Sequence, residues 1–120
     1  MSEAIYIVGG ARTPMGGLMG DLASVSAPQL GSTAIKAAVE RANLDAAVID
    51  EVFMGCVLPA GLKQCPARQA ARYAGVPDHV GAVTVNKACG SGMQATIFGI
   101  DSIRAGTNSI TIAGGLESMS

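Results

Sequence analysis

Residues 86–95 read N-K-A-C-G-S-G-M-Q-A and stand between an apolar run and a helical pattern. The run before them, at 80–85, has the length and flanks of a buried strand. Beyond them, apolar residues recur at steps of three and four, which predicts a helix over 89–104 whose apolar stripe includes Met93 and Ile97. The junction therefore predicts a strand, a glycine-rich turn and a helix in succession, with a cysteine at the turn.

The same alternation extends outward on both sides. Apolar runs bounded by glycine, proline or loop residues predict three more strands, at 4–8, 51–57 and 109–113. Two more helices are predicted, at 28–42 and 66–73. Each begins with a proline that suits the first turn of a helix and continues with small and apolar residues at helical spacing. Strands that alternate with helices indicate the α/β class, a sheet with helices packed on it.

The composition indicates one domain that belongs to something larger. The chain has 120 residues, of which 49% are hydrophobic and only 14% are charged. A domain of this size leaves much surface for charged groups to cover, so part of the apolar surface is expected to meet another part of a longer protein or another subunit. The chain also stops just after a predicted strand, with no helix to cover that strand, so we expect a piece of a longer chain.

Charge and cysteine content exclude several classes of function. The net charge is −1 and the Lys and Arg residues form no cluster, which argues against a nucleic-acid partner. No apolar stretch approaches the ~20 residues of a membrane-spanning helix. Three cysteines without a C-x-x-C pair favour neither a disulfide framework nor a zinc site, and they predict a reduced, cytoplasmic protein.

Cys89 is the candidate for covalent chemistry. At the start of a helix its thiol would lie beside N–H groups that have no intrahelical partner, and the helix dipole adds positive potential. Both effects favour the nucleophilic thiolate. Gly90 and Gly92 would let an acyl group, or another stretch of backbone, approach the sulfur. A buried cysteine beside a structural turn is the competing interpretation.

The other cysteines and the single histidine are interpreted as structural. Cys56 lies in a predicted strand and Cys65 in a loop before a proline. His79 could in principle act as a base for Cys89, but it lies ten residues away across a strand, so an exposed loop histidine is the better interpretation. Gly55, inside the strand at 51–57, indicates a close approach of another backbone.

A dinucleotide-binding module is the second hypothesis. Residues 90–95 fit G-x-G-x-x-A, follow a predicted strand and open a helix, as a phosphate-binding fingerprint would. The first glycine comes too long after the strand, however, and the next strand has no acidic residue at its tip to hold a ribose. A structural or partner-binding piece with inert cysteines is the third hypothesis.

At this point several separated motifs resemble the amino-terminal part of a thiolase of the acetyl-CoA acetyltransferase type. The resemblance covers essentially all of residues 1–120, which would make the chain an incomplete amino-terminal domain. The motifs, in chain order, are A-R-T-P-M-G-G-L, Q-L-G, C-P-A-R-Q-A-A, V-N-K-A-C-G-S-G-M-Q-A and I-A-G-G-L-E-S-M-S.

The resemblance implies both a fold and a reaction. The fold would be part of the layered αβαβα thiolase architecture, with a mixed sheet and helices on both faces. Cys89 would accept the acyl group of an acyl-CoA, and its backbone N–H would form part of an oxyanion hole. A second acyl-CoA would then condense with the acyl group, or thiolysis would reverse the reaction. Acyl-CoA would be the partner, in a homodimer or homotetramer, with no metal and no bound cofactor.

Two departures from the family pattern concern loops. The family commonly has Gly-Gln-Asn-Pro where this chain has Lys63-Gln64-Cys65-Pro66, and Gly81 replaces a frequent proline. Glu117, Ser118 and Ser120 follow the last strand, and we expect a structural role beneath the nucleophile's helix. The bases that family members use lie beyond this chain, so the 120 residues alone are expected to be inactive.

Overall fold

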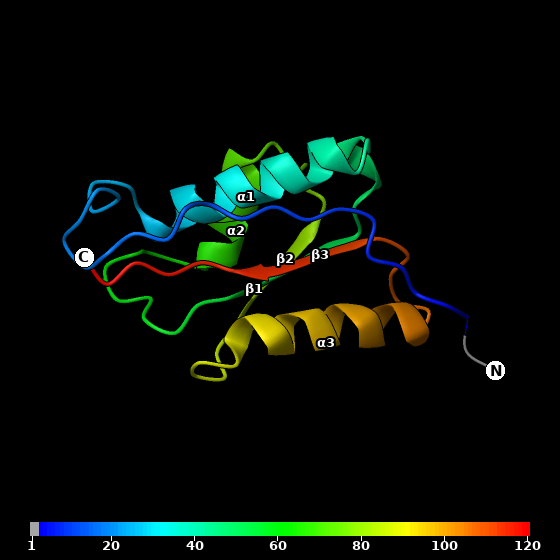
Figure 1. Cartoon of the computed structure of the whole chain (residues 1–120). Coiled ribbons are helices and arrows are strands. Elements are labelled where there is room, and N and C mark those ends of the chain that lie inside the picture. Colours follow the sequence, from blue (N-terminus) through cyan, green and yellow to red (C-terminus); the bar gives the residue numbers. More distant parts are fainter. Residues whose placement is uncertain (1–2) are drawn as a thin grey trace.

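The computed structural model describes residues 3–120 as one sheet with helices on both of its faces (Figure 1). None of the helices in this range is long and apolar enough to cross a membrane. The elements, in chain order, are α1 (Ala27–Arg41), a short 3-10 helix (Ala46–Val48), β1 (Glu51–Gly55), α2 (Pro66–Tyr73), β2 (Gly81–Val85), α3 (Ser91–Arg104) and β3 (Thr111–Gly115).

The sheet has the strand order β2-β1-β3, and both pairs of neighbours are parallel. Glu51 at the start of β1 lies opposite Gly81 on one side and Thr111 on the other. The α/β class is confirmed, whereas the expected mixed sheet is wrong for these three strands. A helix lies between each strand and the next along the chain, and such crossovers return the chain in the same direction.

Alternate side chains of β1 build a core on each face of the sheet. Val52 and Met54 face α1 and α2, where they pack among alanines such as Ala67 and Ala70. Phe53, on the opposite face, packs with Ala95 of α3. The period of two between successive side chains puts neighbours on opposite faces, so one central strand supports both helical layers.

The bounds of α1 follow from its sequence. Ser26 and Gln29 form a capping box, because each side chain accepts a hydrogen bond from the backbone N–H of the other. The helix ends at Arg41, and Asn43 just beyond it takes a left-handed φ of 55°. Gly31 lets the helix lie against Leu116, since an added Cβ would be 2.7 Å from the leucine Cδ2.

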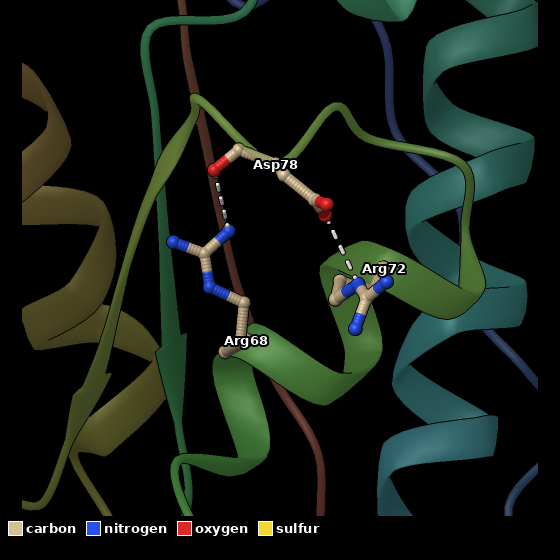
Figure 2. A network of polar contacts seen from close by, with 3 residues as sticks. All are labelled: Arg68, Arg72 and Asp78. Carbon is tan, nitrogen blue, oxygen red and sulfur yellow. Dashed lines mark hydrogen bonds and ion pairs between the residues drawn. The ribbon is translucent and has the colours of Figure 1, made fainter.

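The helix α2 spans the residues expected from the sequence. Gly75, with a φ of 87°, follows its end. Figure 2 shows how it is tied to the loop before β2: the Arg72 Nε lies 3.0 Å from the Asp78 carboxylate, and Arg68 reaches the Asp78 carbonyl. The side chains of the ion pair are 63% and 77% exposed. Such exposed pairs contribute at most about 1 kcal/mol, so the packing of alanines holds α2 in place.

The predicted strand at 4–8 is wrong. Residues 3–10 form no strand, and Tyr6, Ile7 and Val8 are 78%, 89% and 65% exposed. The segment runs beside α1, where the Arg41 guanidinium donates to the Gly10 carbonyl. An apolar run predicts an extended backbone, but it does not say which neighbouring strand will pair with it. Among the described residues, no strand pairs with this segment.

The orientation of α3 also differs from the expected one. Two large apolar residues of its predicted stripe are turned outward, with Met93 74% exposed and Ile97 42% exposed. The face that meets the sheet is made of small residues, Ser91, Ala95 and Gly99, at steps of four. A small-residue face lets the helix approach the strands closely, as Gly99 does at the Thr111 hydroxyl.

Candidate active site

Cys89 lies in the turn between β2 and α3 and is exposed. The helix begins at Ser91, with Gly90 as its N-cap residue, so the thiol lies two residues before the first helical residue. Ala88, directly before the cysteine, takes a left-handed φ of 46°. An alanine in that region is strained, so the surrounding contacts must hold the turn in this shape.

The turn is held by its own hydrogen bonds. The Ser91 hydroxyl accepts from the Lys87 N–H at 2.8 Å and donates to the Ala88 carbonyl at 2.6 Å. The Asn86 side chain accepts from the Ala88 N–H at 3.0 Å. The N–H groups of Gly90 and Ser91 donate back to the carbonyls of residues 87 and 88.

One backbone donor of the turn is left over. Within residues 3–120, hydrogen bonds engage the N–H groups of 87, 88, 90 and 91, and none engages that of Cys89. An exposed thiol and an unengaged N–H thus belong to the same residue. This pairing can serve a nucleophile that attacks a carbonyl carbon while a donor stabilises the carbonyl oxygen.

Close backbone contact fixes the turn to the sheet. At Gly55, the last residue of β1, an added Cβ would lie 2.6 Å from the Ser91 carbonyl carbon and 2.7 Å from the Gly92 nitrogen. At Gly115 in the neighbouring strand, an added Cβ would lie 3.7 Å from the Gly92 Cα. The close approach predicted at Gly55 is confirmed, and it places the start of α3 against the carboxyl ends of β1 and β3.

Glu117 ties the loop after β1 to the end of the chain. Its carboxylate accepts from the N–H groups of Val57 at 2.7 Å and Leu58 at 3.1 Å, and the Cys56 sulfur lies 3.7 Å from it. The structure thus gives Glu117 contacts to the 57–58 loop in place of the expected position beneath α3. Ser120 accepts from the Met19 N–H at 2.8 Å, which joins the first long loop to the same end.

Cys56 is buried, with 2% of its surface exposed. Burial raises the pKa of its thiol above the ordinary value, and the nearby Glu117 charge adds to the effect. A buried neutral thiol next to a carboxylate is a poor nucleophile, which agrees with the structural role predicted for this residue.

The raised pKa of Cys56 predicts a pH dependence of stability. Because the folded state favours the neutral thiol, the stabilisation is complete below the unfolded pKa, near 9.0, and is lost as pH rises through the folded pKa. We expect the free energy of unfolding to fall more steeply above pH 9 in the unaltered protein than in Cys56→Ala. Urea titrations between pH 7 and 10 measure this, with exposed Cys65→Ala as the control. Equal slopes for all three proteins would contradict it.

Two residues of the 57–65 loop hold strained backbones. Lys63 has a φ of 68° and Cys65 a φ of 41°. These are the positions where the thiolase pattern commonly has Gly and Asn, the two residues that best tolerate the left-handed region. The departures noted in the sequence therefore fall at positions with a conformational demand. Cys65 contacts the Thr84 hydroxyl at 3.4 Å, outside the turn that holds Cys89.

Relief of this strain is testable. Lys63→Gly is expected to raise the free energy of unfolding by about 1 kcal/mol, because glycine takes the left-handed conformation without a Cβ penalty. Lys63→Ala is the matched control: it removes the same charge and side chain but keeps the penalty, so it should give no such gain. Chemical denaturation followed by circular dichroism compares the three proteins. An equal gain from both substitutions would assign the effect to the lysine side chain instead.

His79 lies far from Cys89. It is an exposed residue of the turn before β2, whereas the cysteine follows the other end of that strand. Five strand residues at about 3.3 Å each separate the two ends by roughly 16 Å. The structure therefore agrees with an exposed loop histidine and does not bring this imidazole to the thiol.

The turn also bears on the dinucleotide alternative. A phosphate cradle needs the N–H groups of its glycine-rich turn to point at the ligand. Here the N–H groups of Gly90 and Ser91 are already bonded to carbonyls of the same turn. Gly90 also stands five residues beyond the end of β2 at Val85, too far for the tight turn of a dinucleotide fingerprint.

Comparison with known proteins identifies the family of the chain. Residues 5–120 match the model of the thiolase amino-terminal domain. Acetyl-CoA acetyltransferase 2 of Arabidopsis thaliana is 55% identical over 116 residues, which cover 97% of this chain and 29% of the relative. The cytosolic acetyl-CoA acetyltransferase ERG10 of Gibberella zeae has the same identity and coverage.

A solved structure shows the same fold. The Acat5 thiolase from Ascaris suum, in complex with coenzyme A, superposes with a TM-score of 0.94 at 41% identity. The match covers 96% of this chain and 30% of that one. The chain belongs to the thiolase family, and its residues 5–120 match the amino-terminal domain of that family. It spans less than a third of the length of the relatives that it matches.

Sequence reasoning missed the residues that shape the turn. In the sequence, Asn86 and Ser91 stand out only as parts of a motif, yet their side chains make three of the hydrogen bonds around Cys89. The available signal was local: asparagine bonds readily to the backbone two residues on, and serine bonds to backbone at a helix start. Neither tendency says that both will act on the same strained residue.

Proposed function

We propose that the protein is a thiolase that transfers acyl groups between coenzyme A thioesters, with Cys89 as the acyl acceptor. Acetyl-CoA is the proposed substrate, condensed to acetoacetyl-CoA or regenerated by thiolysis. The observation that carries the proposal is the turn itself: an exposed thiol and an unengaged N–H belong to one residue, in a chain of the thiolase family.

The chemistry proceeds in two halves. The Cys89 thiolate attacks the acyl carbon of the first thioester, the oxygen takes the negative charge, and the coenzyme A thiolate leaves as the acyl-cysteine forms. The Cys89 N–H would donate to that oxygen. The α-carbon of a second acyl-CoA, after losing a proton, then attacks the acyl-cysteine and releases the Cys89 thiolate.

The groups that move protons are proposed to come from outside this chain. Its single histidine lies at the other end of β2, and the Cys56 thiol is buried beside Glu117. We therefore expect the isolated 120 residues to show no acyl transfer. The full-length protein is proposed to be a cytoplasmic homodimer or homotetramer that needs no metal and binds neither nucleic acid nor membrane.

Acyl labelling of the full-length protein tests the proposal. After incubation with acetyl-CoA and rapid acid quenching, peptide mass spectrometry should find an acetyl thioester on Cys89 that hydroxylamine removes. The acetyl group should not be found on Cys65, which is also exposed but lies outside the turn. No acetylation of Cys89, together with saturable binding of a dinucleotide, would favour the second hypothesis instead.

A further inference from the structure

The hydroxyl of Ser91 makes a distinctive pair of bonds in the nucleophile turn. Ser91 is only 4% exposed and is the one polar residue of 3–120 that falls among the buried ones. Its oxygen accepts from the Lys87 N–H and donates to the Ala88 carbonyl, at 2.8 Å and 2.6 Å. A single hydroxyl thus bridges the two residues that precede Cys89.

We infer that Ser91 is a positioning residue for acyl transfer, whose hydroxyl holds the turn in the conformation that leaves the Cys89 N–H open to the acyl oxygen. The inference rests on the proposed function of Cys89. It assigns to Ser91 no contact with the substrate, because its hydroxyl is already engaged in both directions by the turn.

The argument starts from the strain at Ala88. Its φ of 46° is unfavourable for a residue with a Cβ, so the turn keeps this shape only while neighbouring groups hold it. The hydroxyl of Ser91 binds the Ala88 carbonyl, and the amide of Asn86 binds the Ala88 N–H. Hydrogen bonds therefore hold both the N–H and the carbonyl of the strained residue.

The second step concerns what release of the turn would do. Without the hydroxyl, the Lys87 N–H loses its partner and the Ala88 carbonyl keeps only the Ser91 N–H at 3.1 Å, so the backbone around residue 87 can rotate toward a new partner. Such rotation re-aims the Cys89 N–H or engages it within the turn. Since reacting groups must be placed to within about 1 Å, this lowers the rate of acyl transfer without removing the thiol.

The position of Ser91 is in turn fixed by the sheet. A Cβ added at Gly55 would lie only 2.6 Å from the Ser91 carbonyl carbon, so the serine packs closely against the end of β1. The hydroxyl is therefore attached to the rigid part of the fold, while the residues it holds, 87 and 88, are exposed. This arrangement is expected of a residue that holds a turn in place and does not itself react.

The test compares two reactions of the same sulfur in the full-length protein. Acetylation of Cys89 by acetyl-CoA depends on how the N–H and thiol are aimed, whereas alkylation by iodoacetamide requires only an accessible thiolate. For Ser91→Ala we expect the acetylation rate at saturating acetyl-CoA to fall at least about tenfold, and the alkylation rate to change less than about twofold. Both rates are measured by mass spectrometry of the Cys89 peptide.

Ser102→Ala is the matched control. Ser102 is on the same helix, and its hydroxyl also donates to a carbonyl three residues earlier, that of Gly99, at 2.8 Å. Eleven residues of helix put it roughly 16 Å from Ser91. It should leave acetylation unchanged, and thermal melting of both variants shows how much each hydroxyl contributes to stability.

Asn86→Ala supplies a second variant at an exposed position, where folding is less at risk. It should also slow acetylation more than alkylation. The inference is overturned if both variants acetylate within about twofold of the unaltered protein, or if acetylation and alkylation fall together. Failure of the unaltered protein to acetylate Cys89 would instead overturn the proposed function on which the inference rests.

Discussion

Replacing Cys89 with alanine is expected to lower acyl transfer by roughly 10⁴-fold or more, because the covalent route loses its nucleophile. The substitution keeps the backbone N–H of residue 89, so it removes the thiol alone. The measurement is the initial rate of thiolysis of acetoacetyl-CoA by the full-length protein, followed by loss of its enolate absorbance. Unchanged thermal melting would show that the fold persists.

Cys65→Ala is the control for this experiment. Cys65 is the other exposed cysteine, and it contacts Thr84 in place of the turn. Its replacement should leave the rate within about twofold, since no reacting group depends on it. A Cys89→Ala protein that kept a tenth of the original rate would remove Cys89 from the mechanism.

Replacing Gly55 with alanine is expected to have the largest effect on stability. The added Cβ would lie 2.6 Å and 2.7 Å from backbone atoms of Ser91 and Gly92, which cannot turn aside as a flexible side chain can. Overpacking of this kind costs about 3 kcal/mol. Urea denaturation followed by circular dichroism measures the loss. Because α3 must shift to make room, the acetylation of Cys89 should fall as well.

Gly17→Ala provides the comparison. Gly17 lies in the first long loop, an added Cβ there meets nothing within 4 Å, and its φ is not in the left-handed region. It should change the free energy of unfolding by no more than about 0.5 kcal/mol. If the two substitutions cost the same, the contact between β1 and α3 would be looser than the structure shows.

The parts of the fold that depend on local signals could be predicted from the sequence. The proline at the start of α2 and Gly75 beyond its end gave the bounds of that helix, and Gly55 indicated the close approach of α3. What could not be predicted depends on partners. The run at 4–8 is apolar enough for a strand but finds no neighbouring strand among the described residues.

The same limit applies to α3 and to the site. Periodicity located the helix, but it favoured the large residues for the buried face, and the sheet accepts the small ones because β1 and β3 leave no room for more. Cys89 was proposed from its position at a helix start and from family motifs. The hydrogen bonds that shape its turn depend on side-chain directions at Asn86 and Ser91, which spacing does not encode.

The outward face of α3 has a consequence for work with this chain in the laboratory. Met93, Ile97 and Phe98 are 74%, 42% and 42% exposed on a helix whose opposite side is already filled. Apolar surface of this kind drives association between molecules. Association between molecules, and not folding, will therefore limit the concentration that a preparation of these 120 residues can reach. Mild detergent or the substitution Met93→Lys should reduce this association, and both leave the buried side of the helix unchanged.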